Sequence, residues 1–345
     1  MKHKHKFNEV LELVLEERKN SYKSLRTAAW EKKIAKRIFE YFEDIFIEDI
    51  NDVRLNRFFS FIRFKNNGSL YSDKYIKSIY SLVKAVFKKA LLKGYITINP
   101  FDYDFKRPKG NIPEAKDRLV SKEDLKALFK ILPKYPKLNV IVPVLFLTGM
   151  RIGELLGLFW TDIDFTEKII HIQRSVVDNY IELPGGEIAK RGVMLSSTKT
   201  ATSIRDIPVS EQVIVLLRSW LEFRDLPENQ KWKDKIELNS NLNLVFPNAQ
   251  GKLTNYKTLY DNLKDILKDN NLNHCNILFH KLRHNYATDL LSAGVDIDVV
   301  SKLLGHKNIE TTANVYVKVD MKPKKNAIKL QSKYLHDINI YSNIM

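Results

Sequence analysis

Three helix-length segments near the end of this chain each carry or lead into polar residues that could act in catalysis. The segment from residue 280 reads His-Lys-Leu-Arg-His, and apolar residues follow at a 3.6-residue period until Ala293-Gly294. His280 and Arg283, three residues apart, therefore lie on one face of the first turn of a helix. A second short helix is expected from about Ile297 to Leu304, and a third from about Ile309.

These helices would bring two histidines, an arginine and a tyrosine together. His306 follows the glycine that ends the second helix, and Tyr316 lies on the third. Such a set suggests chemistry on a phosphate, because guanidinium groups match phosphate oxygens. As an alternative, His280 and His284 could be zinc ligands on one helix face. The zinc-protease pattern, however, has Glu beside the first His, where this chain has Lys281.

Further candidate catalytic residues lie upstream in the sequence. An apolar helix over 140–147 leads into Thr-Gly-Met-Arg-Ile-Gly-Glu-Leu, which contains Arg151 and Glu154. Lys199 lies in a Thr/Ser-rich turn ahead of Arg205. In these residues and their order the chain resembles the tyrosine recombinase, or phage integrase, family, most strongly over 118–318. The resemblance implies six catalytic positions, which are Arg151, Lys199, His280, Arg283, His306 and Tyr316.

The resemblance also implies a role for each position. Tyr316 would attack a phosphodiester to give a 3′-phosphotyrosyl bond and a free 5′-hydroxyl, and Lys199 would protonate that leaving oxygen. His280 would serve as base or proton shuttle, and His306 would hydrogen-bond the phosphate. Arg151 and Arg283 would bind its oxygens. Two further residues, Glu154 and His284, are expected to support the site.

No cofactor is expected. Two arginines can supply the positive charge that many nucleases take from metal ions. The bond energy would be kept in the covalent link, so the resemblance implies neither a metal ion nor ATP. The sequence has no Walker-type glycine loop, which agrees.

The charge of the chain predicts a polyanionic partner. The formal net charge of the 345 residues is +16, and residues 1–110 hold 24 Lys and Arg against 14 Asp and Glu. Residues 7–100 are expected to be helical, with an apolar stripe over 10–15 and further helices near 25–42, 52–64 and 72–93. These four or five helices could form a basic clamp across a duplex. A solvated lysine face is the alternative interpretation. Candidate DNA contacts are Lys84, Lys88, Lys106, Arg107, Lys109 and Arg205.

The expected fold is mainly α with a small antiparallel β-sheet. A helical core-binding domain (1–105) would be joined by a linker (106–117) to a mixed α/β catalytic domain (118–320) and a C-terminal tail (321–345). Strands are expected over 168–177, 192–196 and 203–209, and an amphipathic helix over 211–224. The segment 225–243 is polar and is expected to be a loop.

The predicted function is site-specific recombination that integrates or excises a mobile element. A recombinase that resolves chromosome dimers is one alternative. A type IB topoisomerase-like enzyme and a non-catalytic DNA-binding protein are two others.

The expected partners are duplex recombination sites and further copies of the chain. The resemblance suggests a homotetramer on two duplexes, with a monomeric free form and an accessory directionality factor. The tail repeats apolar residues behind a basic linker and could dock on its own domain or on a neighbouring subunit. No apolar run approaches the roughly 20 residues that span a bilayer. One cysteine fits a reducing compartment, so we expect a cytoplasmic protein associated with the nucleoid.

Overall fold

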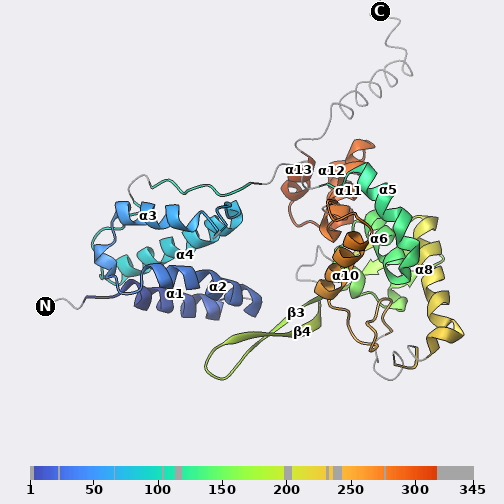
Figure 1. Ribbon diagram of the computed structural model, residues 1–345, viewed down its shortest axis with the longest axis horizontal. Helices are drawn as coiled ribbons and strands as arrows, with labels where there is room; N and C mark the ends of the chain where they lie inside the picture. The colour runs from blue at the N-terminus through green and yellow to red at the C-terminus, as the bar shows by residue number, and fades with distance from the viewer. Residues whose placement is uncertain are drawn as a thin grey trace, which may run out of the picture. The chain divides into compact units, whose positions relative to one another are not determined.

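A computed structural model describes most of the chain, and Figure 1 shows its elements. The described residues are 4–21, 24–65, 67–102, 105–112, 119–197, 204–230, 233–235, 243–275 and 277–316, and the side chains of 314–316 lie outside that description. The chain divides into two compact units. One unit holds Met1–Pro113 with Asp178–Gly192, and the other holds Glu114–Val177 with Val193–Met345.

The first unit contains four main helices. They are α1 (Phe7–Ser21), α2 (Leu25–Tyr41), α3 (Asp52–Ile62) and α4 (Asp73–Leu92). Side-chain caps begin two of them: Asn51 accepts a hydrogen bond from the Arg54 amide, and Ser72 accepts one from the Tyr75 amide. The four helices predicted from periodicity are therefore present.

Aromatic residues fill the core of the first unit. Phe7, Phe42, Phe58 and Phe87 are fully buried, and the Phe42 ring centroid lies 4.4 Å from that of Phe7 and 4.8 Å from that of Phe58. Burial of such rings supplies much of the free energy of folding. Most lysines of α4, namely Lys74, Lys77, Lys84 and Lys88, are exposed, so the core holds the helices while the surface carries the charge.

The second unit combines short strands with helices. Its three-stranded antiparallel sheet has the order β1-β2-β5, from Ile163–Asp164, Ile169–Ile172 and Arg205–Pro208. A separate two-stranded hairpin is formed by β3 (Arg174–Glu182) and β4 (Ile188–Ser197). Only the base of this hairpin belongs to the second unit, because Asp178–Gly192 is part of the first. The helices are α5 (Lys122–Ile131), α6 (Pro136–Thr148), α7 (Ile152–Leu156), α8 (Glu211–Asp225), α10 (Tyr256–Asp269), α11 (Phe279–Ser292), α12 (Ile297–Leu304) and α13 (Ile309–Tyr316).

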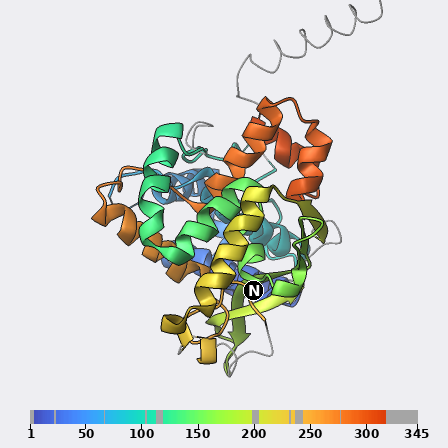
Figure 2. The same ribbon diagram turned by 90° about the vertical axis from the view of Figure 1, so that its right-hand side faces the viewer.

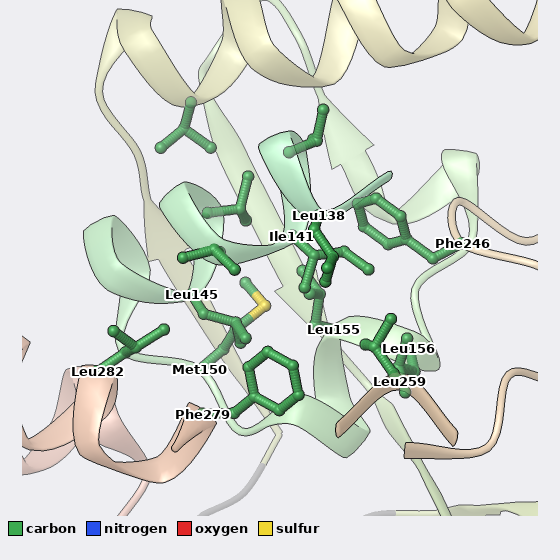
Figure 3. Close-up of a cluster of buried hydrophobic side chains, with 14 of the residues drawn as sticks. Leu138, Ile141, Leu145, Met150, Leu155, Leu156, Phe246, Leu259, Phe279 and Leu282 are labelled. Carbon is green, nitrogen blue, oxygen red and sulfur yellow. The ribbon is translucent and has the colours of Figure 1, made fainter. Parts of the chain in front are cut away.

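Helix α6 is the centre of the second unit. It packs against both α8 and α11, and it is apolar around most of its circumference, as expected for a buried helix. Figure 3 shows Leu138, Ile141 and Leu145 of α6 among Met150, Leu155 and Phe279. Figures 1 and 2 show α11, α12 and α13, in orange to red, as neighbouring short helices. The core therefore anchors the ends of α6, α7 and α11.

The expected fold class is confirmed, but the strands differ from the prediction. The stretch 168–177 is split, because β2 pairs with β1 and β5 while β3 pairs with β4. The hairpin also extends well past the predicted 192–196, with Pro184-Gly185-Gly186 at its turn. Lys199 and the tail 321–345 lie outside the described residues. Among the described residues, no helix has the length and apolar character needed to cross a membrane.

The single cysteine ties a loop to a helix. Cys275 is buried ahead of α11, and its thiol donates to Asp124 Oδ1 of α5 at 2.9 Å. Burial, with the neighbouring Asp124, raises the pKa of this thiol to about 11. The protonated thiol is therefore a hydrogen-bond donor within the structure.

Candidate active site

The site begins where α6 stops. Gly149 ends the helix with φ of 63°, a left-handed conformation that glycine adopts without strain. A Cβ atom at this position would lie 2.2 Å from Cδ1 of Tyr286, so glycine is required for space as well. The tight turn places Met150 in the core and starts α7 directly after Arg151.

Arg151 and Glu154 bind each other across the first turn of α7. The Arg151 amide donates to Glu154 Oε2 at 2.8 Å, and Arg151 Nη1 donates to Oε1 at 2.6 Å. Glu154 is 2% exposed, whereas the Arg151 side chain is 43% exposed. A buried carboxylate thus holds a guanidinium that still faces solvent.

Arg283 reaches the same place from α11. Its Nη1 donates to the Gly149 carbonyl at 2.8 Å, and its Nη2 donates to the Leu304 carbonyl at 2.7 Å. Burial, followed by the charge of Arg151, lowers the pKa of Arg283 to about 9, so the guanidinium is still protonated at neutral pH. Two catalytic candidates from distant parts of the sequence are therefore brought together.

Arg205 departs from the sequence prediction. We expected a DNA contact, but its side chain is 7% exposed and is directed into the protein. Nη1 and Nη2 donate to the two Glu154 oxygens at 3.2 and 2.9 Å, and Nε donates to the Leu303 carbonyl at 2.7 Å. Burial alone would raise the pKa of Glu154, but the hydrogen bonds and charge of Arg205, with Arg151, lower it overall. Glu154 is therefore ionised.

His306 follows the end of α12. Gly305 ends that helix in the left-handed region, and the His306 amide donates to the Ser301 carbonyl at 3.0 Å. The His306 Nδ1 atom lies 2.8 Å from the hydroxyl of the buried Thr312 on α13. Burial, then the charges of Arg283 and Arg151, lowers the pKa of His306 to about 4. The imidazole is therefore neutral at pH 7.

The other two histidines predicted for the site, His280 and His284, lie on the first turns of α11. His280 is exposed, and its ring is perpendicular to that of His284 with centroids 5.9 Å apart. Partial burial and the charge of Lys281 lower the pKa of His280. Tyr316 is the last residue of α13, one helical turn after Thr312. Its side chain and the whole of Lys199 lie outside the described residues.

The other DNA-contact candidates belong to the first unit. Lys84 and Lys88 are exposed on α4 and line a groove with Lys77 and Arg107. Arg107 is paired with Asp73 at 2.7 Å, so its guanidinium also orders the chain after α4. Lys106 and Lys109 are exposed on the same segment. The groove is therefore basic, and its positive charge comes mainly from exposed lysines. It differs in this from the second unit, where arginines share the buried carboxylate of Glu154.

The charges of the site suit a phosphodiester. The guanidinium groups of Arg151 and Arg205 pair with the one carboxylate of Glu154, and that of Arg283 lies close enough to feel its charge, which leaves excess positive charge beside the exposed edge of Arg151. A planar guanidinium can bind two oxygens of a phosphate, and it does so more strongly where water is partly excluded. Among the described residues, the ligand types grouped closely enough for a metal ion are Asp124, His274 and Cys275, and there the thiol donates to Asp124.

Comparison with known proteins identifies the family. Residues 118–322 match the phage integrase family, and residues 6–108 match the phage integrase SAM-like domain. The chain therefore belongs to the phage integrase family of tyrosine recombinases.

The relatives include recombinases of several kinds. A tyrosine recombinase XerC-like protein of Caldanaerobacter subterraneus subsp. tengcongensis is 32% identical over 82% of this chain and 71% of its own length. The transposase from transposon Tn916 of Enterococcus faecalis is 25% identical over 74% of this chain. Our chain aligns with only 60% of the length of that transposase.

Solved structures share the fold. The Tn1549 transposon integrase in complex with transposon right end DNA matches with a TM-score of 0.71 at 20% identity, covering 94% of this chain and 99% of that one. A lambda integrase tetramer bound to a Holliday junction matches with a TM-score of 0.61 at 14% identity, over 91% of this chain and 78% of that one. At these identities the likeness supports the fold alone.

Proposed function

We propose that this protein cuts and rejoins duplex DNA at specific sites through a covalent link to Tyr316. The observation that carries the proposal is the meeting of Arg151, Arg283 and His306 at one end of α12, with Glu154 buried behind Arg151. These groups come from three separate parts of the sequence, so their convergence is a property of the fold. Two guanidinium groups and an imidazole can together bind the negatively charged oxygens of a phosphodiester.

The reaction is a transesterification in which atoms and charge balance. The Tyr316 oxygen attacks phosphorus, and the bond from phosphorus to the 5′-oxygen breaks. His280 takes the phenolic proton, and Lys199 gives a proton to the leaving 5′-oxygen. Rejoining runs the same steps in reverse with a 5′-hydroxyl from the same or another duplex.

Neutral His306 fits the role of a hydrogen-bond donor. If the Thr312 hydroxyl donates to Nδ1, the ring carries its proton on Nε2 and can give it to a non-bridging oxygen of the phosphate. Because its pKa is low, His306 adds no further positive charge beside Arg151, Arg205 and Arg283. The donor would therefore be held in place without adding to the repulsion among the cations.

We infer that strand transfer needs neither a metal ion nor ATP. Arg151 and Arg283 supply fixed positive charge where the phosphate would lie, and electrostatic stabilisation of this kind is often the largest part of catalysis. The energy of the broken phosphodiester is kept in the phosphotyrosyl link. The arginines thus take the role that a metal pair has in many nucleases.

The first unit would supply affinity. Its basic groove along α4 includes Lys84 and Lys88, and such cations bind phosphates whatever the base sequence. We propose that 1–105 and 118–320 act as the DNA-binding and catalytic domains, joined by 106–117. Four subunits on two duplexes, with tails (321–345) exchanged between neighbours, would complete the assembly, and an accessory factor would set direction. Such an enzyme would act in the cytoplasm on nucleoid DNA.

Movement of a mobile element is the role we favour. The relatives include the Tn916 transposase and the ICEBs1 integrase of Bacillus subtilis, which is 26% identical over 71% of this chain. Relatives named Xer support the alternative of chromosome-dimer resolution. Identification of the DNA that the protein attacks separates the two roles, because one predicts element ends and the other a single chromosomal site.

Trapping of the covalent intermediate tests the proposal. The full chain is incubated with nicked duplex fragments of the source genome in excess EDTA, denatured in SDS, and the DNA that remains attached is sequenced. We expect an SDS-stable adduct enriched in one sequence. Tyr316→Phe should bind that sequence with near-normal affinity and form no adduct, because only one oxygen is removed.

Tyr260→Phe on α10 is the matched control, since it removes one hydroxyl elsewhere in the second unit and should still give adduct. An adduct from Tyr316→Phe would reject Tyr316 as the nucleophile. Activity that vanished in EDTA and returned with magnesium would reject the metal-free mechanism. Relaxation of supercoiled DNA without exchange between two sites would favour the topoisomerase alternative.

A further inference from the structure

Three consecutive carbonyls at the end of α12 each accept a hydrogen bond from a different arginine. The Leu303 carbonyl binds Arg205 Nε at 2.7 Å, and the Leu304 carbonyl binds Arg283 Nη2 at 2.7 Å. The Gly305 carbonyl binds Arg151 Nη2 at 3.2 Å. The last carbonyls of a helix lack partners within the helix and carry its negative end, so they attract cations.

The three arginines join this helix end to four other elements. Arg151 precedes α7, Arg205 lies on β5 and Arg283 lies on α11, while Arg283 also binds the carbonyl at the end of α6. Glu154 connects two of the arginines, because it accepts from both Arg151 and Arg205. The helix end is therefore fixed by a network in which each contact constrains the others.

Arg205 differs from Arg151 in what its nitrogens do. All three nitrogens donate within the protein, to the two Glu154 oxygens and to Leu303. Its side chain is 7% exposed, whereas that of Arg151 is 43% exposed. Arg205 is thus oriented toward protein acceptors, while Arg151 keeps an edge open to solvent.

The backbone at Gly305 fits closely against Arg205. A Cβ atom at residue 305 would lie 3.0 Å from Arg205 Nη1 and 3.1 Å from its Cδ. The next residue is His306, whose ring contacts Thr312 of α13, and α13 ends at Tyr316. A shift of the Arg205 guanidinium would therefore be transmitted to the turn that positions His306 and begins α13.

We infer that Arg205 is a positioning residue for the transesterification, holding Glu154 and the 303–306 turn at one spacing so that Arg151, Arg283 and His306 act on the same phosphate. The inference rests on the proposed function. It replaces the DNA contact that the sequence suggested for Arg205. Its role is to fix geometry, since a misplacement of about 1 Å can cost roughly 100-fold in rate.

Arg205→Lys tests the inference, because lysine keeps the charge but cannot bind two Glu154 oxygens and Leu303 together. The probe is the duplex recovered from the wild-type adduct. Affinity, measured with Tyr316→Phe as the background, should change by less than about threefold, and the single-turnover rate of adduct formation should fall by about 30- to 100-fold. Glu154→Gln combined with Arg205→Lys should be no slower than the slower single variant, because both act through one network.

Arg174→Lys is the matched control. Arg174 also pairs with a buried carboxylate in the second unit, that of Asp162, so the substitution removes the same kind of contact. It should lower the melting temperature without slowing adduct formation at a temperature where the protein is folded. Should Arg205→Lys fail to fold, Gly305→Ala approaches the network from the other side and should likewise slow the reaction while affinity is kept.

Three results would overturn the inference. One is a rate for Arg205→Lys equal to that of Arg174→Lys. Another is weakened binding with an unchanged rate at saturating DNA, which would restore the DNA contact. The third is a double variant whose loss is the product of the single losses. A wild-type chain that forms no adduct with any fragment would instead reject the proposed function, and the inference with it.

Discussion

The helical first unit and the arginine site of the second unit use positive charge in opposite ways. In the first unit, Lys84 and Lys88 are exposed along α4 above a core of apolar and aromatic residues. In the second, Arg205 and Arg283 are buried, and each binds protein acceptors at 2.7–3.2 Å. Attraction to a polyanion depends mainly on how many charges are present, whereas catalysis depends on where they are. Substitutions should therefore have different consequences in the two regions.

The largest effect should come from Arg151→Lys. Lysine keeps the charge but cannot bind Glu154 and Gly305 while presenting a planar edge to a phosphate. We expect the rate of adduct formation at saturating DNA to fall by roughly 10²- to 10³-fold, as when one fixed donor is removed from an active site. Arg218→Lys, on the exposed side of α8, is the control and should react normally. A loss of less than tenfold at Arg151 would mean that charge alone suffices there.

An intermediate effect is expected when Lys84 and Lys88 are both changed to Ala. Affinity should fall, and the slope of log affinity against log salt should decrease in magnitude by about 2, because two phosphate contacts no longer release counterions. The rate at saturating DNA should not change. Lys264 and Lys268, an exposed pair at the same spacing on α10, provide the control. An equal change in slope from the control pair would remove the special role of the α4 groove.

The smallest effect concerns pH. Burial and the nearby arginines lower the pKa of His306 from 6.5 to about 4, so the unfolded chain binds more protons than the folded one between those values. The neutral His306 should therefore contribute to the free energy of unfolding above pH 6.5, and this contribution should be lost as the pH falls toward 4. In His306→Gln, the drop in melting temperature between pH 6.5 and pH 4 should be smaller than in the wild type by about 3 °C. His274→Gln controls for the loss of a histidine. A melting temperature that falls equally with pH in the wild type and in His306→Gln would contradict the lowered pKa of His306.

Local patterns in the sequence predicted the helices of the site. Periodicity and the glycines at 294 and 305 were sufficient for the segments that became α11 and α12. The spacing of Arg151 and Glu154 also predicted their contact, because residues three apart on a helix face each other. Information of this kind lies within one or two turns of a single element.

Features that depend on distant partners were missed. Arg205 resembled a surface cation, and nothing near it in the sequence indicates that Glu154 and Leu303 enclose it. Which strand pairs with which also depends on segments far apart, so 168–177 was not divided. The hairpin did have a local signal, since Pro184-Gly185-Gly186 is a turn sequence between residues of strand type.

The protonated, buried Cys275 has a practical consequence for spectroscopy. It is the only cysteine in the chain, and its raised pKa means that little thiolate is available to react with a maleimide at neutral pH. A cysteine introduced at an exposed position such as Leu13 of α1 would therefore take up a dye selectively, without removal of the native residue. The wild-type background is thus already suited to single-site fluorescent labelling, and fluorescence from such a dye could follow the first unit as the protein engages DNA.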